Sequence, residues 1–388
     1  MSRPVAIVGA GQSDYGDFPA LTMKDLFAEA YDELVASIDR GYDPADVDAA
    51  YVGNLGTGGA QLGLASALCT DYVGLDGIPV ERVENACASG GYALVNAVEA
   101  VSSGERDVAL AAGVEKMRDL SGDRSKYWLG VSGDTEYERL AGMTFAGVYA
   151  IMAQRYLAET DADHDHLSMV AVKNHANGAA NPHAQFQREI DLETATGAPA
   201  VADPLNLYDA CPTTDGAACA LVVPAEEAAA YTDDPVHVTG YGAASDALAL
   251  HDRETITSVP AARLAAERAY ERAGIGPDDV DVAEVHDCFT IAEVLAYEDL
   301  GFAERGRGWE LIAEGVTARD GARPVNTSGG LKSKGHPLGA TGIGQVVELF
   351  EQLRGTAGGR QVEATTGLSH NVGGSGGAAT VFVYEVGS

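Results

Sequence analysis

The sequence predicts an α/β protein made of two similar units, in each of which helices cover a sheet. Apolar strand-like runs alternate with Ala-rich helical stretches of ten or more residues, which is typical of sheets with parallel strands. Segments near the N-terminus also reappear, in the same order, in the last part of the chain. With 388 residues, of which 46% are hydrophobic, the chain can bury a large core.

The repeat pairs segments of the first 115 residues with segments of the last 156. The strand-like run PVAIVGAGQSD near the start is similar to PVHVTGYGAASD at 235–246. Helical stretches that end at a glycine follow in both parts, at 26–41 and 263–274. Each leads into a similar motif, PADVDAAYV in the first part and PDDVDVAEV in the second. Predicted helices at 91–104 and 342–355 then precede strand-like runs at 107–113 and 360–367.

Residues 116–208 have no counterpart in the repeat. They contain a predicted helix at 145–160 and nearly half of the histidines. A long insertion in a compact fold usually serves as a lid or a binding loop. We therefore expect an N-terminal domain of residues 1–115 with 209–232, an inserted loop domain of 116–208, and a C-terminal domain of 233–388.

The chain is strongly acidic, with 25 Lys and Arg against 58 Asp and Glu, a net charge of −33 and a pI near 4.4. Such a charge argues against nucleic acid and anionic membranes as partners. It favours a protein kept soluble in the salty cytoplasm of a halophilic archaeon, with an ordinary acidic enzyme as the alternative. No apolar run is long enough for a transmembrane helix, and the N-terminus lacks the pattern of a signal peptide. Five cysteines without a CxxC pair favour a reducing cytoplasm.

Cys87 is a candidate nucleophile. It lies in ENACASGG, between a strand end and the helix predicted at 91–104. A helix N-terminus stabilises a thiolate, and small neighbours let a substrate approach closely. On spacing alone, a buried structural cysteine fits equally well, and the glycine-rich turn favours the nucleophile.

Two further segments carry candidate site residues. His336 lies in a glycine-rich loop, SGGLKSKGHPLGATGIG, whose rigidity favours a site residue over a core residue. His286 and Cys288 close the apolar strand VDVAEV, at the end where open α/β sheets place their ligands. They point to the same side because strand side chains alternate. The glycine cluster at 369–377 is suited to offer backbone N–H groups to an oxyanion.

Other candidates have simpler interpretations. GAGQSDYG near the N-terminus lacks the full GxGxxG pattern and is interpreted as a strand and turn. His164 and His166 could bind a metal, but their acidic surroundings favour a solvated loop or a helix start. Cys211 and Cys219 are interpreted as packing residues.

In their order along the chain, four motifs resemble those of the thiolase superfamily, namely ENACASGG, HDCFT, GGLKSKGHPLGATG and HNVGG. Within it, the chain is similar to the sterol-carrier-protein-type thiolases and the archaeal acetoacetyl-CoA thiolases. The resemblance covers essentially the whole chain. It implies a duplicated thiolase fold, with two similar mixed-sheet domains, helices in αβαβα layers and an inserted loop domain.

One departure from the common thiolase pattern concerns the acid/base residue. Familiar thiolases carry a second cysteine in a C-terminal CxGGG motif, where this chain has Asn371, with His370 before it. They also have the Asn of an NEAF motif where this chain has His286. Both changes are typical of the sterol-carrier-type branch, and the resemblance implies that Cys288 supplies the missing thiol. His370 and Asn371 are additional candidates at the site.

The resemblance implies condensation of two acetyl-CoA molecules to acetoacetyl-CoA through an acyl-Cys87 intermediate, without metal or cofactor. His336 would take the thiol proton, Cys288 would remove the α-proton, and His336 with His286 would hold a thioester oxygen. Backbone N–H groups of Cys87 and Gly373 would form a second oxyanion hole. Which of Cys288 and His336 moves each proton stays open.

Weak candidates for binding CoA phosphates are Lys332 and Lys334, together with the cations that open the insertion, Lys116, Arg118, Arg124 and Lys126. As partners, the resemblance implies a second copy in a dimer or tetramer, a small zinc-ribbon/OB-fold protein, and a hydroxymethylglutaryl-CoA synthase. Alternative functions are a ketosynthase or hydroxymethylglutaryl-CoA-synthase-like condensing enzyme, and a non-catalytic thiolase-like subunit.

Overall fold

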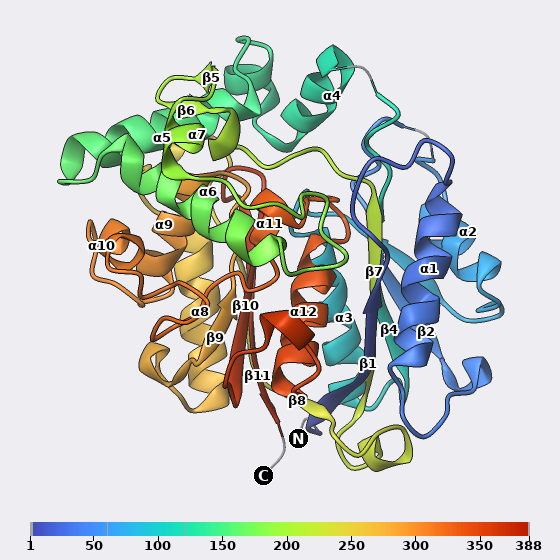
Figure 1. Ribbon diagram of the computed structural model, residues 1–388. Coiled ribbons are helices and arrows are strands. Elements are labelled where there is room, and N and C mark those ends of the chain that lie inside the picture. Colours follow the sequence, from blue (N-terminus) through green and yellow to red (C-terminus); the bar gives the residue numbers. More distant parts are fainter. Residues whose placement is uncertain (1–2, 60, 121, 387–388) are drawn as a thin grey trace.

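Strands from both ends of the chain form one mixed sheet (Figure 1), in the order β3-β2-β4-β7-β1-β8-β11-β10-β9. The computed structural model describes residues 3–59, 61–120 and 122–386, so the outermost residues of the predicted terminal domains, 1–2 and 387–388, lie outside it. The strands of this sheet are β1 (Val5–Gln12), β2 (Ala49–Gly53), β3 (Val80–Val83), β4 (Ala109–Glu115), β7 (Gly216–Pro224), β8 (Val236–Ser245), β9 (Val282–Glu284), β10 (Thr366–Gly373) and β11 (Ala378–Val386).

The helices fall into those of the two halves and one inserted group. Those of the halves are α1 (Met23–Ala36), α2 (Ala65–Tyr72), α3 (Ser89–Ser103), α8 (Pro260–Ala273), α9 (Thr290–Asp299), α10 (Gly308–Ala313), α11 (Gly330–Ser333) and α12 (Thr341–Leu353). The predicted insertion contains α4 (Gly122–Leu129), α5 (Phe145–Glu159), α6 (His164–Gly178) and α7 (Leu192–Thr196), with a small ladder of β5 (Ala200–Ala202) and β6 (Leu205–Asn206).

The strand order repeats the duplication that the sequence predicts. From the centre outward, β1, β7, β4 and β2 on one side match β8, β11, β10 and β9 on the other. The two halves do not form separate sheets, because β1 and β8 pair antiparallel through Val5–Ile7 and Val236–Val238. Both halves mix parallel and antiparallel pairs, so the sheet is mixed as the resemblance implies.

The helices complete a five-layer arrangement that runs across Figure 1. Helices α3 and α12 contact strands of both halves and form the middle layer. On the outer faces, α1 packs on β1 and β7, and α8 packs on β8 and β11. Alanines and aliphatic side chains fill the spaces between these layers in separate buried clusters. None of the described helices has the length and apolar composition needed to cross a lipid bilayer.

Two predicted strands begin later than the sequence suggests. The strand expected at 360–367 starts only at Thr366, because side chains take up the backbone N–H groups before it. Val362 N–H donates to Gln352 Oε1 (2.9 Å) and Thr365 N–H donates to Asp281 Oδ2 (2.9 Å). The small-residue segment 211–223, which reads as a strand in the sequence, becomes one only from Gly216, while the N-terminal GAGQSDYG ends β1 as predicted.

The two halves approach each other closely around the carbonyl oxygen of Gly339. A Cβ placed on Gly53, Gly90 or Gly113 would lie 2.7, 2.8 or 2.0 Å from this oxygen, so three glycines form a socket for it. Beside the socket, the buried Glu115 carboxylate accepts N–H groups of residues 55–57 and of Gly339. The 335–340 loop is therefore held against the first half by both backbone groups of Gly339.

Filling the socket should destabilise the protein. We expect Gly113→Ala to lower the free energy of unfolding by about 3 kcal/mol, since the added methyl would collide with backbone that cannot move aside. Gly63→Ala is the control, because a Cβ there meets nothing within 4 Å. Chemical denaturation measures both, and equal midpoints for the two variants would show that the socket is not a constraint.

Candidate active site

Cys87 lies at a sharp turn between β3 and α3. Ala86 adopts a positive φ of 51°, an uncommon conformation for a residue with a side chain. Ser89 at the start of α3 holds the turn, since its Oγ accepts from Asn85 N–H (3.0 Å) and donates to the Ala86 carbonyl (2.6 Å). The turn places the Cys87 thiol next to the N-terminus of a 15-residue helix, as predicted.

The predicted histidines converge on this thiol. One ring nitrogen of His286, one of His336 and the Cys87 sulfur all lie within 4.8 Å of one another. The two imidazole rings are 5.1 Å apart between centroids, edge to face. Between His286 and Cys288, the buried Asp287 carboxylate accepts the N–H groups of Leu331 (2.7 Å) and Lys332 (3.1 Å). The HDC tripeptide thus holds the loop that leads to His336.

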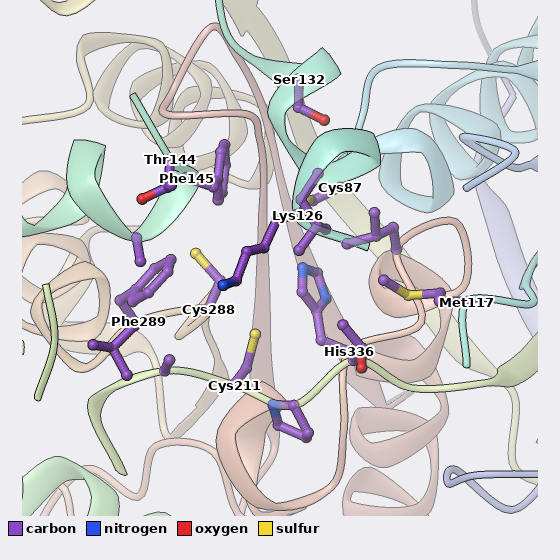
Figure 2. A pocket seen from close by; sticks show the side chains of 17 residues that line it. Cys87, Met117, Lys126, Ser132, Thr144, Phe145, Cys211, Cys288, Phe289 and His336 are labelled. Atoms are coloured by element: carbon purple, nitrogen blue, oxygen red, sulfur yellow. The ribbon is translucent and has the colours of Figure 1, made fainter. Parts of the chain in front are cut away.

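Cys87 and His336 line a cavity of about 250 Å³, with Cys288 and Cys211 on the opposite wall (Figure 2). The remaining lining is mostly apolar, and the insertion supplies much of it. These residues are Met117, Lys126, Leu129, Ser132, Thr144, Phe145, Ala146, Val201, Ala210, Pro212, Thr213, Phe289 and Leu338. The insertion therefore forms part of the candidate site, which is the role expected of it.

Burial keeps the Cys87 thiol neutral. It raises the pKa of Cys87, and the neighbouring Cys211 adds to the rise, while hydrogen bonds from the N–H groups of Gly374 and Cys87 itself oppose it. Desolvation therefore outweighs the stabilisation of the thiolate that these N–H groups provide. The Gly374 N–H acts on the sulfur itself, and the donor role of Gly373 toward the acyl oxygen stays a prediction.

His336 is a neutral imidazole with one nitrogen available. Burial lowers the pKa of His336 from 6.5 to about 3. Its Nδ1 lies 2.7 Å from Thr341 Oγ1, and that hydroxyl donates to the Pro337 carbonyl (3.0 Å). The hydroxyl therefore accepts from Nδ1–H, and Nε2 keeps a lone pair. Nε2 is buried without a hydrogen-bond partner among the described residues, so it can take a proton from a nearby group.

Of the two additional candidates, Asn371 reaches the site and His370 lies behind it. The Asn371 side chain contacts the Cys87 carbonyl and the His286 ring. His370 Nδ1 accepts from the His286 backbone N–H (3.5 Å), and its ring lines a separate small cavity with Tyr149 and His286. His370 therefore supports His286 without facing the Cys87 cavity.

Two residues of the cavity region are not predicted from the sequence. Cys211, interpreted as a packing residue, lines the cavity, because its backbone N–H bonds to the Cys288 carbonyl (3.0 Å) and places the two cysteines side by side. Tyr149 of α5 forms a side-chain hydrogen bond with Cys288 and donates to the Gly374 carbonyl (3.1 Å). Neither residue lies in a recognisable motif, and only the fold brings them to the site.

Burial raises the pKa of the Cys288 thiol, and the neighbouring Cys87 adds to the rise.

The lysines proposed for CoA phosphates have internal positions. Lys334 is buried and donates to the Gly344 carbonyl (2.8 Å), while Lys332 is buried between the rings of Phe186 and Tyr208. Neither lines the Cys87 cavity, and their contact with CoA phosphates stays a prediction. Lys116 pairs with the buried Asp215 (2.6 Å). Lys126 is different, since it is exposed on α4 and lines the cavity.

His164 and His166 lie in the first turn of α6, so their interpretation as a helix start is confirmed. Asp163 is the N-cap residue and forms a capping box with His166, while His164 Nε2 bonds the buried Asp209 (2.8 Å). Cys87, His286 and His336 have metal-ligating atoms at suitable separations. Nδ1 of His286, however, lies 3.2 Å from Nδ2 of Asn371.

The pH dependence of stability should report the burial of His370. Burial lowers its pKa from 6.5 to about 3, so between these values the unfolded chain binds a proton that the folded chain does not. Stability is therefore lost as pH falls through this window. We expect His370→Gln to remove about 2 kcal/mol of the wild-type loss between pH 7 and pH 5. Chemical denaturation at both pH values tests this, and an unchanged pH difference would contradict it.

Comparisons with known proteins agree with this geometry. Residues 5–226 match the thiolase N-terminal domain, and residues 242–386 match the thiolase C-terminal domain-like family. An acetyl-CoA acetyltransferase of Methanothermobacter thermautotrophicus is 46% identical, over 99% of this chain and 100% of that protein. Another, of Methanocaldococcus jannaschii, is 43% identical over 98% of both. The solved structure of an Ltp2-ChsH2(DUF35) aldolase superposes with a TM-score of 0.85 at 25% identity, over 98% of this chain and 97% of that one. The chain belongs to the thiolase family.

Proposed function

We propose that the protein condenses two acetyl-CoA molecules to acetoacetyl-CoA and free CoA, and catalyses the reverse thiolysis, through an acetyl group on Cys87. The observation that carries the proposal is the convergence of Cys87, His336 and Cys288 around one cavity, with a ring nitrogen of His286 within 4.8 Å of the Cys87 sulfur. The names of the two archaeal relatives support acetyl-CoA as the substrate. Each step uses side chains of the chain and the two thioesters, so the proposal includes no cofactor or metal.

In the first half-reaction, Cys87 attacks the thioester carbonyl. Its thiol is neutral, so His336 Nε2 takes the proton as the new C–S bond forms. The bond to CoA breaks, and the CoA thiolate takes a proton from the Cys288 thiol on the facing wall. The products are acetyl-Cys87, CoA, a protonated His336 and a Cys288 thiolate.

In the second half-reaction, the Cys288 thiolate removes an α-proton from a second acetyl-CoA. The carbanion attacks the acetyl carbonyl, a C–C bond forms, and the bond to Cys87 breaks. Cys87 regains its proton from His336, and all three groups return to their starting states. N–H groups of Cys87 and Gly373 would stabilise the oxyanion on the acetyl group, where such donors contribute about 2.7–4 kcal/mol each.

Lys126 is the cation we propose for the CoA phosphates or the entering thioester. It lines the cavity mouth from the insertion, whereas Lys332 and Lys334 lie inside the protein. Since the chain carries a net charge of −33, a cation at the mouth would offset repulsion of the anionic substrate.

A second copy of the chain is the partner we propose for the edge of the sheet. In the described residues, β3 pairs with β2 alone, which leaves its other edge unpaired next to Cys87. Leu62, Leu64 and Tyr72, exposed by 49%, 78% and 50%, precede β3 along the chain.

We also propose a small zinc-ribbon/OB-fold partner and association with a hydroxymethylglutaryl-CoA synthase. The ChsH2(DUF35) component named in the aldolase structure supports the small partner.

The acidity supports a proposal that the protein works at high salt, in a halophilic archaeon. At molar salt the Debye length falls to about 3 Å, which screens the mutual repulsion of two chains that each carry −33. We expect light scattering in molar KCl to give a mass of 80 kDa or 160 kDa, twice or four times the 40.1 kDa chain. A 40 kDa particle at micromolar concentration under these conditions would contradict the proposed assembly.

Substitution of Cys288 should separate the two half-reactions. We expect Cys288→Ala to leave acetylation of Cys87 largely intact, because CoA can leave as a thiolate and take its proton from water. Condensation should slow by about 10²-fold or more, because the α-proton loses its base. Cys87→Ala should abolish both steps. Mass spectrometry of the acetylated protein and an assay of CoA release measure them.

The control is Cys219→Ala, which removes a buried thiol of β7 away from the cavity. Acetyl groups found on Cys288 and never on Cys87 would overturn the assignment of the nucleophile. Condensation at the wild-type rate in Cys288→Ala would move the base to another group. A folded wild-type protein that takes no acetyl group would favour a non-catalytic thiolase-like subunit.

A further inference from the structure

The side-chain amide of Asn371 has a fixed orientation. Its Oδ1 accepts from the Gly91 N–H (3.2 Å) and its Nδ2 donates to the Cys87 carbonyl (3.0 Å). Both partners are backbone groups, one of which can only donate and the other only accept. A flipped amide would set N–H against N–H and oxygen against oxygen, so the backbone of α3 and its entry turn decides where the NH₂ group lies.

The same NH₂ group lies against His286. Its second N–H points to His286 Nδ1, at 3.2 Å. A nitrogen that accepts a hydrogen bond carries a lone pair, so Nδ1 is unprotonated. A neutral imidazole then has its proton on Nε2. His286 is neutral, because burial and the nearby rings of His336 and His370 lower its pKa well below the usual value.

The two imidazoles beside Cys87 are therefore opposite tautomers. His336 has its proton on Nδ1 toward Thr341 and a lone pair on Nε2, whereas His286 has its proton on Nε2. Nε2 of His286 is buried and has no hydrogen-bond partner among the described residues. An unused buried donor next to a base and a nucleophile is suited to bind a substrate oxygen.

We propose that Asn371 is a positioning residue that holds His286 as the Nε2–H tautomer, and so makes it a hydrogen-bond donor to the thioester oxygen. The donor role rests on the proposed function, whereas the tautomer does not. The position where familiar thiolases carry a second cysteine thus orients the proton on a neighbouring ring and itself transfers none.

The same tautomer keeps a metal ion out of the cluster. Cys87, His286 and His336 have ligand atoms within 4.8 Å, which would suit a thiophilic cation. A neutral histidine coordinates through an unprotonated nitrogen, yet the Asn371 amide covers Nδ1 of His286 and Nε2 carries the proton. An aspartate at 371 would reverse this, because a carboxylate accepts from Nδ1–H and frees Nε2, as second-shell carboxylates do in metal sites.

The first test is ¹⁵N NMR of the protein labelled at its histidine rings, without substrate, with the His286 signals assigned by their loss in His286→Gln. We expect a protonated Nε2 and an unprotonated Nδ1 in the wild type. In Asn371→Asp we expect Nδ1 to carry a proton, and in Asn371→Ala a mixture of tautomers. A protonated Nδ1 in the wild type would overturn the proposal.

The second test is the affinity for Co²⁺, read from the visible absorption of a cobalt–thiolate complex. We expect Asn371→Asp to bind at least 10-fold more tightly than the wild type. Asn181→Asp is the matched control, since Asn181 is another buried amide that bonds two backbone groups, the Ser328 carbonyl and the His183 N–H. Equal Co²⁺ affinity in the wild type and Asn371→Asp, with both folded, would contradict the proposal.

The third readout is condensation, which should fall by about 10²-fold in Asn371→Asp, the usual cost of losing one oxyanion donor. Asn181→Asp should retain the wild-type rate. A wild-type protein with the expected tautomer but no acetyl transfer would refute the proposed function alone. Full condensation by an Asn371→Asp protein with a reversed tautomer would refute the donor role.

Discussion

The contact of the Gly339 carbonyl oxygen with Gly53, Gly90 and Gly113 is the constraint on which the site depends. It joins backbone to backbone, without side chains between, and so brings the His336 loop of the second half to the Cys87 turn of the first. Helices α3 and α12 begin on either side of this contact, and both lie in the middle layer. Because the three glycines have no side chain between the two halves, the Cys87 thiol and the His336 imidazole can lie within 4.8 Å of each other.

The buried thiols and imidazoles of the site carry no charge, whereas the surface of the protein is strongly acidic. The thiols of Cys87 and Cys288 and the rings of His286 and His336 are all neutral because burial disfavours their charged forms. The buried acidic residues near them hold the surrounding loops in place. Glu115 and Asp287 each accept backbone N–H groups of the loops that carry or precede the site residues. Charge therefore arises on these two thiols and two rings only when substrate arrives and a proton moves.

The sequence predicts the fold class and the catalytic candidates well, because both depend on local signals. Helix-ending glycines, alternating strands and helices, and the repeated PADVDAAYV motif survive in the structure as equivalent positions in one sheet. Cys87, His286, Cys288 and His336 come together because their motifs lie at turns and strand ends. The pKa of Cys87 could not be predicted, since desolvation depends on groups distant in the chain.

Long-range contacts also explain the residues that were missed or misassigned. Cys211 enters the cavity through a backbone bond to Cys288, and Tyr149 enters from a helix of the insertion. Lys332 and Lys334 look exposed in a polar loop, but the insertion covers that loop.

The antiparallel pairing of β1 with β8 has a consequence for how substrate enters. The two halves are continuous through hydrogen bonds in the sheet and through glycines in the middle layer. A hinge between them would have to break both, and with them the arrangement of thiol and imidazole. The segment from α4 to β5, by contrast, lines the cavity through Lys126, Phe145 and Val201 and lies outside the shared sheet. Substitutions in this segment can therefore change the shape of the cavity while the hydrogen bonds and close glycine contacts that join the two halves stay as they are.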